Sequence, residues 1–326
     1  MALPPLLQGL RIPAFGAPLF IIQNPDLVIA QCKAGIPGCF PALNAREEKG
    51  EPPLLDAWLT QIGEELDRHN QANPDRPAAP FGVNQIVHRS NIRLERDLEI
   101  MVRHEVPICV TSLGARPEVY EAVHGYGGIM FHDVINDRFA RKAVEKGADG
   151  LIAVACGAGG HAGPISPFAL VEEIREWFDG PLLLAGAIAR GHQILAAEAM
   201  GADLAYIGSA FIATEEADAE ADYKQMLVEG SSADIVSSSW FTGIPANYLA
   251  PSMRRAGLVP EALPAGDASM MDFSEAPSSD RPKAWSEIWS SGQGINAVKQ
   301  VVSAAELIAR LEAEYHAARH RLALDR

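Results

Sequence analysis

The sequence predicts an α/β fold, a (β/α)8 TIM barrel with an inserted, mostly helical second domain. Three observations lead to this prediction. Eight short apolar runs alternate with segments of helical periodicity. Turns of small residues follow the seventh and eighth runs, and a loop with four glycines and one histidine follows the sixth. In TIM barrels the active site forms from the loops at these strand ends.

The eight apolar runs are the expected barrel strands. Short apolar strands separated by helices form parallel βαβ units, and eight such units close into a barrel. An open, doubly wound sheet is the alternative arrangement of the same elements. The expected strands cover residues 17–22, 38–43, 81–87, 107–111, 128–132, 150–155, 181–185 and 203–207, and helical periodicity is clear in 54–69, 91–104, 137–146 and 168–178.

The chain changes character after Phe211. Residues 214–221 are acidic, 231–239 are rich in serine, and 260–283 are rich in Pro, Ala, Ser and Asp. We expect a helix at about 247–257, and a long amphipathic helix at about 297–322 would be the last helix of the barrel. The barrel is therefore predicted to comprise residues 1–213 and 286–326. Residues 214–285 would form an inserted helical or irregular subdomain that covers the site.

Composition excludes several classes of function. The chain has 326 residues, of which 48% are hydrophobic, so a large core can be buried. Its formal net charge of −15 would repel nucleic acid and an anionic membrane surface. No apolar run reaches the roughly 18 residues that a membrane span requires. The expected partners are small molecules, and a homo-oligomer is compatible with the sequence.

The four cysteines favour a reduced protein without a zinc site. Cys32, Cys39, Cys109 and Cys156 lie in apolar stretches and form no CxxC pair. The first 16 residues lack the charged and apolar regions of a signal peptide. These features predict a cytoplasmic location and no metal site.

Two small-residue turns point to a phosphorylated ligand. Gly186 and Ala187 follow the seventh expected strand, and Gly208 and Ser209 follow the eighth. Barrels often bind phosphate with these two loops, because glycine lets backbone N–H groups come close and a hydroxyl adds a donor. The alternative is that both turns merely lead into helices. The turns do not identify the ligand.

The loop of residues 156–164 is the most unusual stretch of the chain. Its four glycines fit a backbone that lies against a flat or charged ligand. Ala162 breaks the dinucleotide pattern GxGxxG, and no GK[ST] of a P-loop follows. His161 would lie at the barrel mouth, where a neutral imidazole can remove a proton or position a polar substrate. The alternative is a structural histidine bonded to a loop carbonyl.

Two further strand ends carry polar side chains that we expect to face the mouth. Asn84 lies in the third expected strand, where its amide could bond a ligand. His132 ends the fifth expected strand, next to Asp133.

These motifs together resemble the nitronate monooxygenases, formerly called 2-nitropropane dioxygenases. The A-G-G-H stretch that ends at His161 is the most specific of them. The resemblance covers nearly the full length, through Ala17-Pro18-Leu19-Phe20, residues 82–84, 158–163, 185–189, 207–211 and 289–294.

The resemblance implies an FMN bound non-covalently in the barrel, beneath a mostly helical second domain. His161 matches the family's catalytic histidine. Ala17 to Phe20 would run along the flavin, and Asn84 and His132 would lie against the cofactor. Gly186, Ala187, Gly208 and Ser209 would hold its phosphate, while Gly159, Gly160 and Gln293 would lie close to it.

The implied reaction is oxidation of an alkyl nitronate, and by extension a nitroalkane, by O₂ to a carbonyl compound and nitrite. His161 would be the base or the group that binds the anion. One alternative is an NAD(P)H-dependent FMN reductase of quinones or enoyl thioesters. The others are a non-redox barrel that binds a phosphorylated metabolite, and a ligand-binding protein without turnover.

Overall fold

The computed structural model describes residues 3–47, 51–267 and 284–322, and its centre is a closed barrel of parallel strands. The first barrel strand pairs in parallel with the last, so the predicted TIM barrel is confirmed and the open sheet is not found. The order around the barrel is β1 (Ala14–Gly16), β2 (Gly38–Pro41), β3 (Phe81–Ile86), β4 (Ile108–Ser112), β5 (Ile129–Val134), β6 (Gly150–Val154), β8 (Leu182–Ala185) and β9 (Leu204–Ile207).

The first strand differs from the prediction. β1 lies before residues 17–22, and these residues instead form the loop that follows it. Pro18 has no N–H to donate to a ladder. The loop is held by side chains: the Gln23 amide oxygen accepts from Leu19 N at 2.8 Å, and the Asn44 amide oxygen accepts from Ile21 N at 2.8 Å. The shift moves residues 17–20 to the carboxyl end of the barrel.

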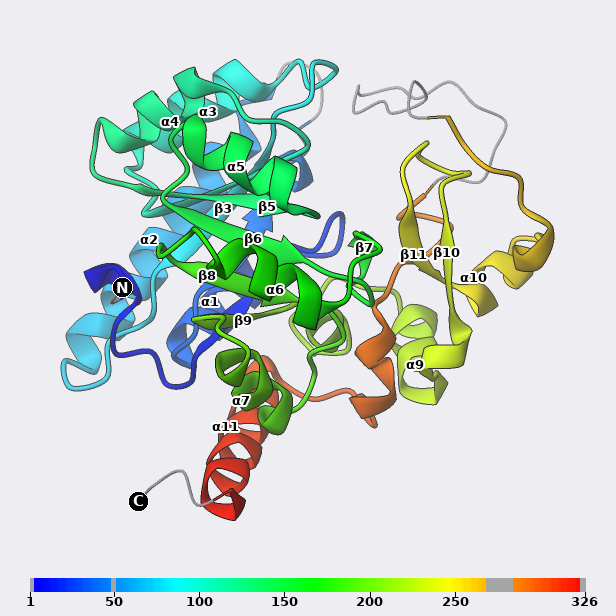
Figure 1. Cartoon of the computed structure of the whole chain (residues 1–326). Coiled ribbons are helices and arrows are strands. Elements are labelled where there is room, and N and C mark those ends of the chain that lie inside the picture. The colour runs from blue at the N-terminus through cyan, green and yellow to red at the C-terminus, as the bar shows by residue number, and fades with distance from the viewer. Residues whose placement is uncertain (1–2, 48–50, 268–283, 323–326) are drawn as a thin grey trace.

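Helices surround the barrel (Figure 1). They are α1 (Pro25–Lys33), α2 (Leu54–Ala72), α3 (Leu94–Arg103), α4 (Pro117–His124), α5 (Asp137–Glu145), α6 (Pro167–Arg175), α7 (Gly191–Ala199), the short α8 (Ser209–Ile212) and α11 (Ala304–Arg321). In the described parts of the chain, each helix is too short or too polar to cross a bilayer.

The C-terminal helix α11 returns to the barrel. It begins later than the sequence predicted, at the capping box that Ser303 forms with Glu306. Its buried face includes Leu307 and Leu311, and it packs on α7 and α1. A Cβ on Gly191 would lie 2.2 Å from the Leu311 carbonyl oxygen, so glycine permits the close approach of α7.

The barrel interior is filled by side chains that alternate along each strand. Phe15, Phe131 and Tyr206 meet there, with the Phe15 ring centroid 6.4 Å from that of Phe131 and 5.5 Å from that of Tyr206. Because alternate residues of a strand share a face, Phe131 places Asp133 on the same inner face, one layer nearer the mouth.

Residues 214–267 leave the barrel and lie beside one end of it (Figure 1). They contain α9 (Ala221–Glu229), β10 (Ile235–Ser238), β11 (Ala246–Leu249) and α10 (Ala250–Arg255). The expectation of a mostly helical insert is therefore incomplete, because β10 and β11 form an antiparallel sheet with β7 (Gly160–His161). The division into two domains stays a prediction, and residues 268–283 of the expected irregular stretch lie outside the described residues.

Short 3-10 helices complete the described elements. Their bounds are Pro5–Leu7 (η1), Ala42–Asn44 (η2), Ser232–Asp234 (η3), Pro260–Ala262 (η4) and Gln293–Ala297 (η6).

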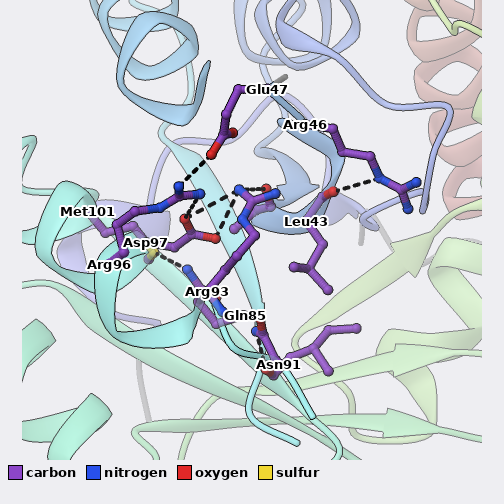
Figure 2. A network of polar contacts seen from close by, with 11 residues as sticks. Leu43, Arg46, Glu47, Gln85, Asn91, Arg93, Arg96, Asp97 and Met101 are labelled. Atoms are coloured by element: carbon purple, nitrogen blue, oxygen red, sulfur yellow. Dashed lines mark hydrogen bonds and ion pairs between the residues drawn. The ribbon is translucent and has the colours of Figure 1, made fainter. Parts of the chain in front are cut away.

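A buried ionic network ties α3 to the segment after β2 (Figure 2). Asp97 is fully buried, and Arg93 NH2 lies 3.1 Å from its carboxylate. Arg93 also donates to the Ala42 carbonyl at 3.2 Å, while Arg96 joins Asp97 to Glu47. Burial raises the pKa of Asp97, and the two arginines oppose that rise.

Candidate active site

A cavity of about 660 Å³ opens at the carboxyl ends of the barrel strands. Its volume is within the range of about 300–1,000 Å³ that is usual for cofactor and ligand sites. The loops after β1, β6, β8 and β9 contribute to its wall, and Tyr223, Ile244, Trp285 and Ser290 close it from outside the barrel. The cavity therefore lies where TIM barrels carry their chemistry.

The polar lining favours an anionic ligand. Asp133 is the single carboxylate among the described lining residues, which also include Lys142, Lys146, His132 and His161. This local balance contrasts with the net charge of −15 for the chain. Both lysines are exposed, so solvent and salt screen part of their attraction for a negatively charged ligand.

His161 lies in β7 and is held from both sides. Ala246 of β11 is its partner in the antiparallel ladder. Its ring meets the Trp285 ring edge-on, with centroids 5.4 Å apart and an interplanar angle of 81°. Although part of its surface opens into the cavity, the surrounding protein desolvates the imidazole and lowers its pKa to about 4. At neutral pH His161 is therefore uncharged.

Hydrogen bonding selects one tautomer of His161. The Thr242 hydroxyl donates to the Ile244 carbonyl oxygen at 3.1 Å, since a carbonyl can only accept. That hydroxyl oxygen lies 3.0 Å from His161 Nε2, so Nε2 is the donor and carries the proton. The unprotonated nitrogen is Nδ1, which has no hydrogen-bond partner among the described residues. His161 can thus accept a proton at Nδ1 while Nε2 stays anchored.

The glycines of this loop permit close contact with residues 290–294. A Cβ on Gly159 would lie 2.9 Å from both the Gly292 nitrogen and the Ser209 hydroxyl oxygen. Gly160 has a φ of +71°, which disfavours other residues, and its N–H donates to Ser290 Oγ at 2.7 Å. The loop is therefore packed against a segment that lies about 130 residues later in the sequence.

The two turns predicted to bind a phosphate lie together on the cavity wall. Gly186, Ala187, Gly208 and Ser209 all line the cavity. Ser209 Oγ accepts the Gly292 N–H at 2.8 Å and is not bonded to an acceptor among the described residues, so its own proton is available to a ligand oxygen. Ala187 has a φ of +56°, the left-handed region that favours glycine.

Most of the other predicted site residues also line the cavity. Ala17, Pro18, Leu19, Phe20 and His132 do so, together with the histidine and glycines described above. Burial lowers the pKa of His132 to about 4, and its Nδ1 lies 2.6 Å from Thr111 Oγ1. It is therefore a neutral wall residue tied to β4.

Two predicted residues do not line the cavity. Asn84 lies behind the wall, buried, and donates to Ser112 Oγ at 2.8 Å and to the Val110 carbonyl at 3.2 Å. Gln293 contributes its backbone, because its N–H donates to the Gly157 carbonyl at 2.9 Å. Direct contact between their side chains and a ligand is not supported.

Sequence reasoning missed several lining residues. Lys142 lies in α5 and Lys146 directly follows that helix, while Trp285 lies more than 100 residues later in the sequence. Asp133 was passed over for His132, although strand alternation from the buried Phe131 could have identified it as an inner residue. Among the described residues, no group of three or more His, Cys, Asp or Glu could hold a metal ion.

Fold and site together define a TIM-barrel enzyme with a neutral histidine on the wall of a cavity at the carboxyl ends of the strands. A family model described as nitronate monooxygenase matches residues 58–314. The match covers well over half of the chain, so this protein belongs to the nitronate monooxygenase family and is an oxidoreductase of that family.

Curated relatives agree with this assignment. The Neurospora crassa nitronate monooxygenase is 26% identical over 328 residues, which cover 90% of this chain and 83% of that protein. The Mycobacterium tuberculosis protein Rv1533, named as a candidate monooxygenase, is 33% identical over 154 residues, or 47% of this chain. That match spans only 41% of the length of Rv1533.

Solved structures share the fold. FabK from Thermotoga maritima has a TM-score of 0.74 and 22% identity, with 97% of this chain and 96% of FabK covered. The nitroalkane oxidase from Streptomyces ansochromogenes also has a TM-score of 0.74, with 24% identity and coverage of 95% and 97%. At such identities the likeness concerns the fold alone.

Proposed function

We propose that this protein is an FMN-dependent enzyme that oxidises alkyl nitronates with O₂, giving a carbonyl compound and nitrite. The observation that carries the proposal is a neutral, anchored His161 on the wall of a cavity with cationic and phosphate-compatible groups. Family membership and the name of the Neurospora crassa relative support the same reaction.

The residues present fit an FMN. The Ser209 hydroxyl and the turns at Gly186 and Gly208 would hold the phosphate. The glycines let backbone groups come close to a ligand, the Ser209 hydroxyl has a proton to donate, and no carboxylate lies beside them. Pro18 and Leu19 supply apolar wall for a flat ring. When bound, the flavin supplies the electron transfer to O₂ that no side chain can perform.

His161 would act on the substrate through Nδ1. With a neutral nitroalkane, Nδ1 takes the proton from the carbon that bears the nitro group, and the product is a nitronate anion beside an imidazolium. Nε2–H, bonded to Thr242, keeps the ring in place during this transfer. With a nitronate supplied directly, no proton need be removed, and the lysines of the lining favour binding of the anion.

The test measures O₂ consumption and nitrite release by flavin-loaded protein, with 3-nitropropionate and, separately, with propionate 3-nitronate. His161→Gln should lose about 100-fold or more in rate on the nitroalkane, the contribution usual for a general base, and less on the nitronate. His124→Gln is the matched control, because His124 pairs with Asp149 away from the cavity.

If flavin-replete protein turns over neither compound, the proposal is refuted. Rapid anaerobic bleaching of the flavin by NADH, together with that lack of turnover, would instead favour the NAD(P)H-dependent reductase.

A further inference from the structure

The inner floor of the cavity carries a hydrogen-bonded chain that ends in a carboxyl group. Asn84 Nδ2 donates to Ser112 Oγ at 2.8 Å, and Ser112 Oγ donates to Asp133 Oδ2 at 2.6 Å. The direction is determined, since an amide nitrogen can only donate and the serine proton is then left for the carboxylate. Three neighbouring strands, β3, β4 and β5, thus hold Asp133 in one orientation.

The second oxygen of Asp133 is not satisfied by the protein. Oδ1 is buried and has no hydrogen-bond partner among the described residues, and the same is true of the hydroxyl of Tyr206, another lining residue. A buried polar atom without a partner costs about 1–3 kcal/mol. Such atoms on a cavity wall are suited to a ligand that supplies the missing partner.

The electrostatic surroundings favour the protonated acid. No ion pair to Asp133 occurs in the described parts of the chain. Burial raises the pKa of Asp133 to about 6, while the hydrogen bond from Ser112 opposes the rise. The titratable groups around it are Cys39 and Tyr206 inside the barrel, neutral His132 beside it on β5, and His161, Lys142 and Lys146 elsewhere on the cavity wall.

We propose that Asp133 is the flavin-contacting acid of this enzyme: it takes a proton from solvent when the flavin binds and donates it in a hydrogen bond to an acceptor atom of the ring system. Ser112 and Asn84 are positioning residues, because they act through the Asp133 carboxyl. The proposal rests on the proposed function, since it assumes that the cavity binds a flavin. No oxidation or reduction is involved; the carboxylate and one proton become a carboxylic acid.

Proton uptake makes flavin affinity depend on pH. Above the pKa of free Asp133 the site must acquire a proton on binding, so Kd should rise up to tenfold per pH unit between pH 6.5 and 8.5. Below pH 5.5 Asp133 is already protonated, and Kd should level off. Riboflavin is the better probe, because the phosphate of FMN itself titrates near pH 6.

The experiment titrates apoprotein with riboflavin, and in parallel with FMN, from pH 5 to 8.5 by flavin fluorescence. Calorimetry at pH 8 in two buffers of different ionisation enthalpy counts the protons taken up. Wild type should take up close to one proton per riboflavin. Asp133→Asn, which donates from an amide at every pH, should take up none and should bind with a Kd independent of pH.

Two further variants separate Asp133 from its neighbours. Ser112→Ala should move the midpoint of the pH profile to higher pH without abolishing it, because the bond that stabilises the carboxylate is lost. His132→Gln should leave proton uptake unchanged. Thermal melting of each apoprotein checks that the variants fold.

The outcomes distinguish this proposal from the one on which it rests. Riboflavin binding without proton uptake in wild type, or uptake that persists in Asp133→Asn, overturns the role of Asp133 and leaves the flavin assignment intact. If wild-type protein binds neither riboflavin nor FMN, both proposals are wrong.

Discussion

Replacing Gly159 by alanine tests whether the glycine–histidine loop must lie directly against residues 290–294. The added Cβ would be 2.9 Å from the Gly292 nitrogen and from Ser209 Oγ, and 3.1 Å from the Ser291 carbonyl carbon. Two of these three neighbours are backbone atoms, which cannot rotate away. The φ of Gly159 is outside the left-handed region, so the effect is purely steric.

The expected magnitude follows from this overpacking. Forcing an extra methyl into a filled space costs about 1–3 kcal/mol. The free protein can relieve that strain by letting the loop and Gly292 move apart, but binding of the proposed FMN would need both in place. The strain then appears in the affinity, and Kd for FMN should rise about 5- to 150-fold.

The assay is quenching of FMN fluorescence by apoprotein, with thermal melting as a check of folding. Gly63→Ala is the control: Gly63 lies in α2 with open space around it, so alanine should stabilise the helix by about 0.5–1 kcal/mol and leave FMN affinity unchanged. A Gly159→Ala protein with wild-type affinity would refute the packing argument.

Two further predictions concern stability. Ala187→Gly should increase the free energy of unfolding by about 0.5–1 kcal/mol, because relief of the strained φ of +56° exceeds the entropic cost of glycine. Ala256→Gly, at an ordinary φ of −79°, should decrease the free energy of unfolding by a similar amount. Urea unfolding of both variants checks the contrast, and equal losses of stability would contradict it. Arg93→Met should lower the free energy of unfolding by about 3 kcal/mol in the same assay, because Asp97 stays buried with only Arg96 as its partner. Adding Asp97→Asn should recover part of that loss. A loss below about 1 kcal/mol would mean that the ionic network of Figure 2 contributes little to stability.

Local chemistry made much of the barrel predictable from sequence. Apolar runs bounded by turns identified the strands because a parallel barrel buries both faces of each strand. The same reasoning misplaced the first strand: the run at 17–22 is apolar because it lines a cavity, and Pro18 prevents it from joining the ladder.

The candidate site was predictable where backbone conformation requires a particular residue. Gly160 and the turns at Gly186 and Gly208 could be found because small residues permit close approach. The positions of Asn84 and Gln293 could not be predicted. The direction of the Asn84 side chain depends on strand register, and the placement of Gln293 depends on its contact with Gly157, which is distant in sequence. Thr242 and Trp285 were missed for the same reason.

The pairing of β7 with β11 limits how this site can vary in length. His161 is opposite Ala246, only four residues beyond its hydrogen-bond partner Thr242. Inserting or deleting one residue between them would force either the ladder or the Thr242 contact to break, and a slip of one position turns a side chain to the opposite face of a strand. The glycine–histidine loop is consequently not a portable motif. Grafting residues 156–164 onto another barrel would transfer the His161 imidazole without the strand and the Thr242 hydroxyl that orient it. Exchange of this loop between relatives should therefore succeed only when residues 242–247 are exchanged with it.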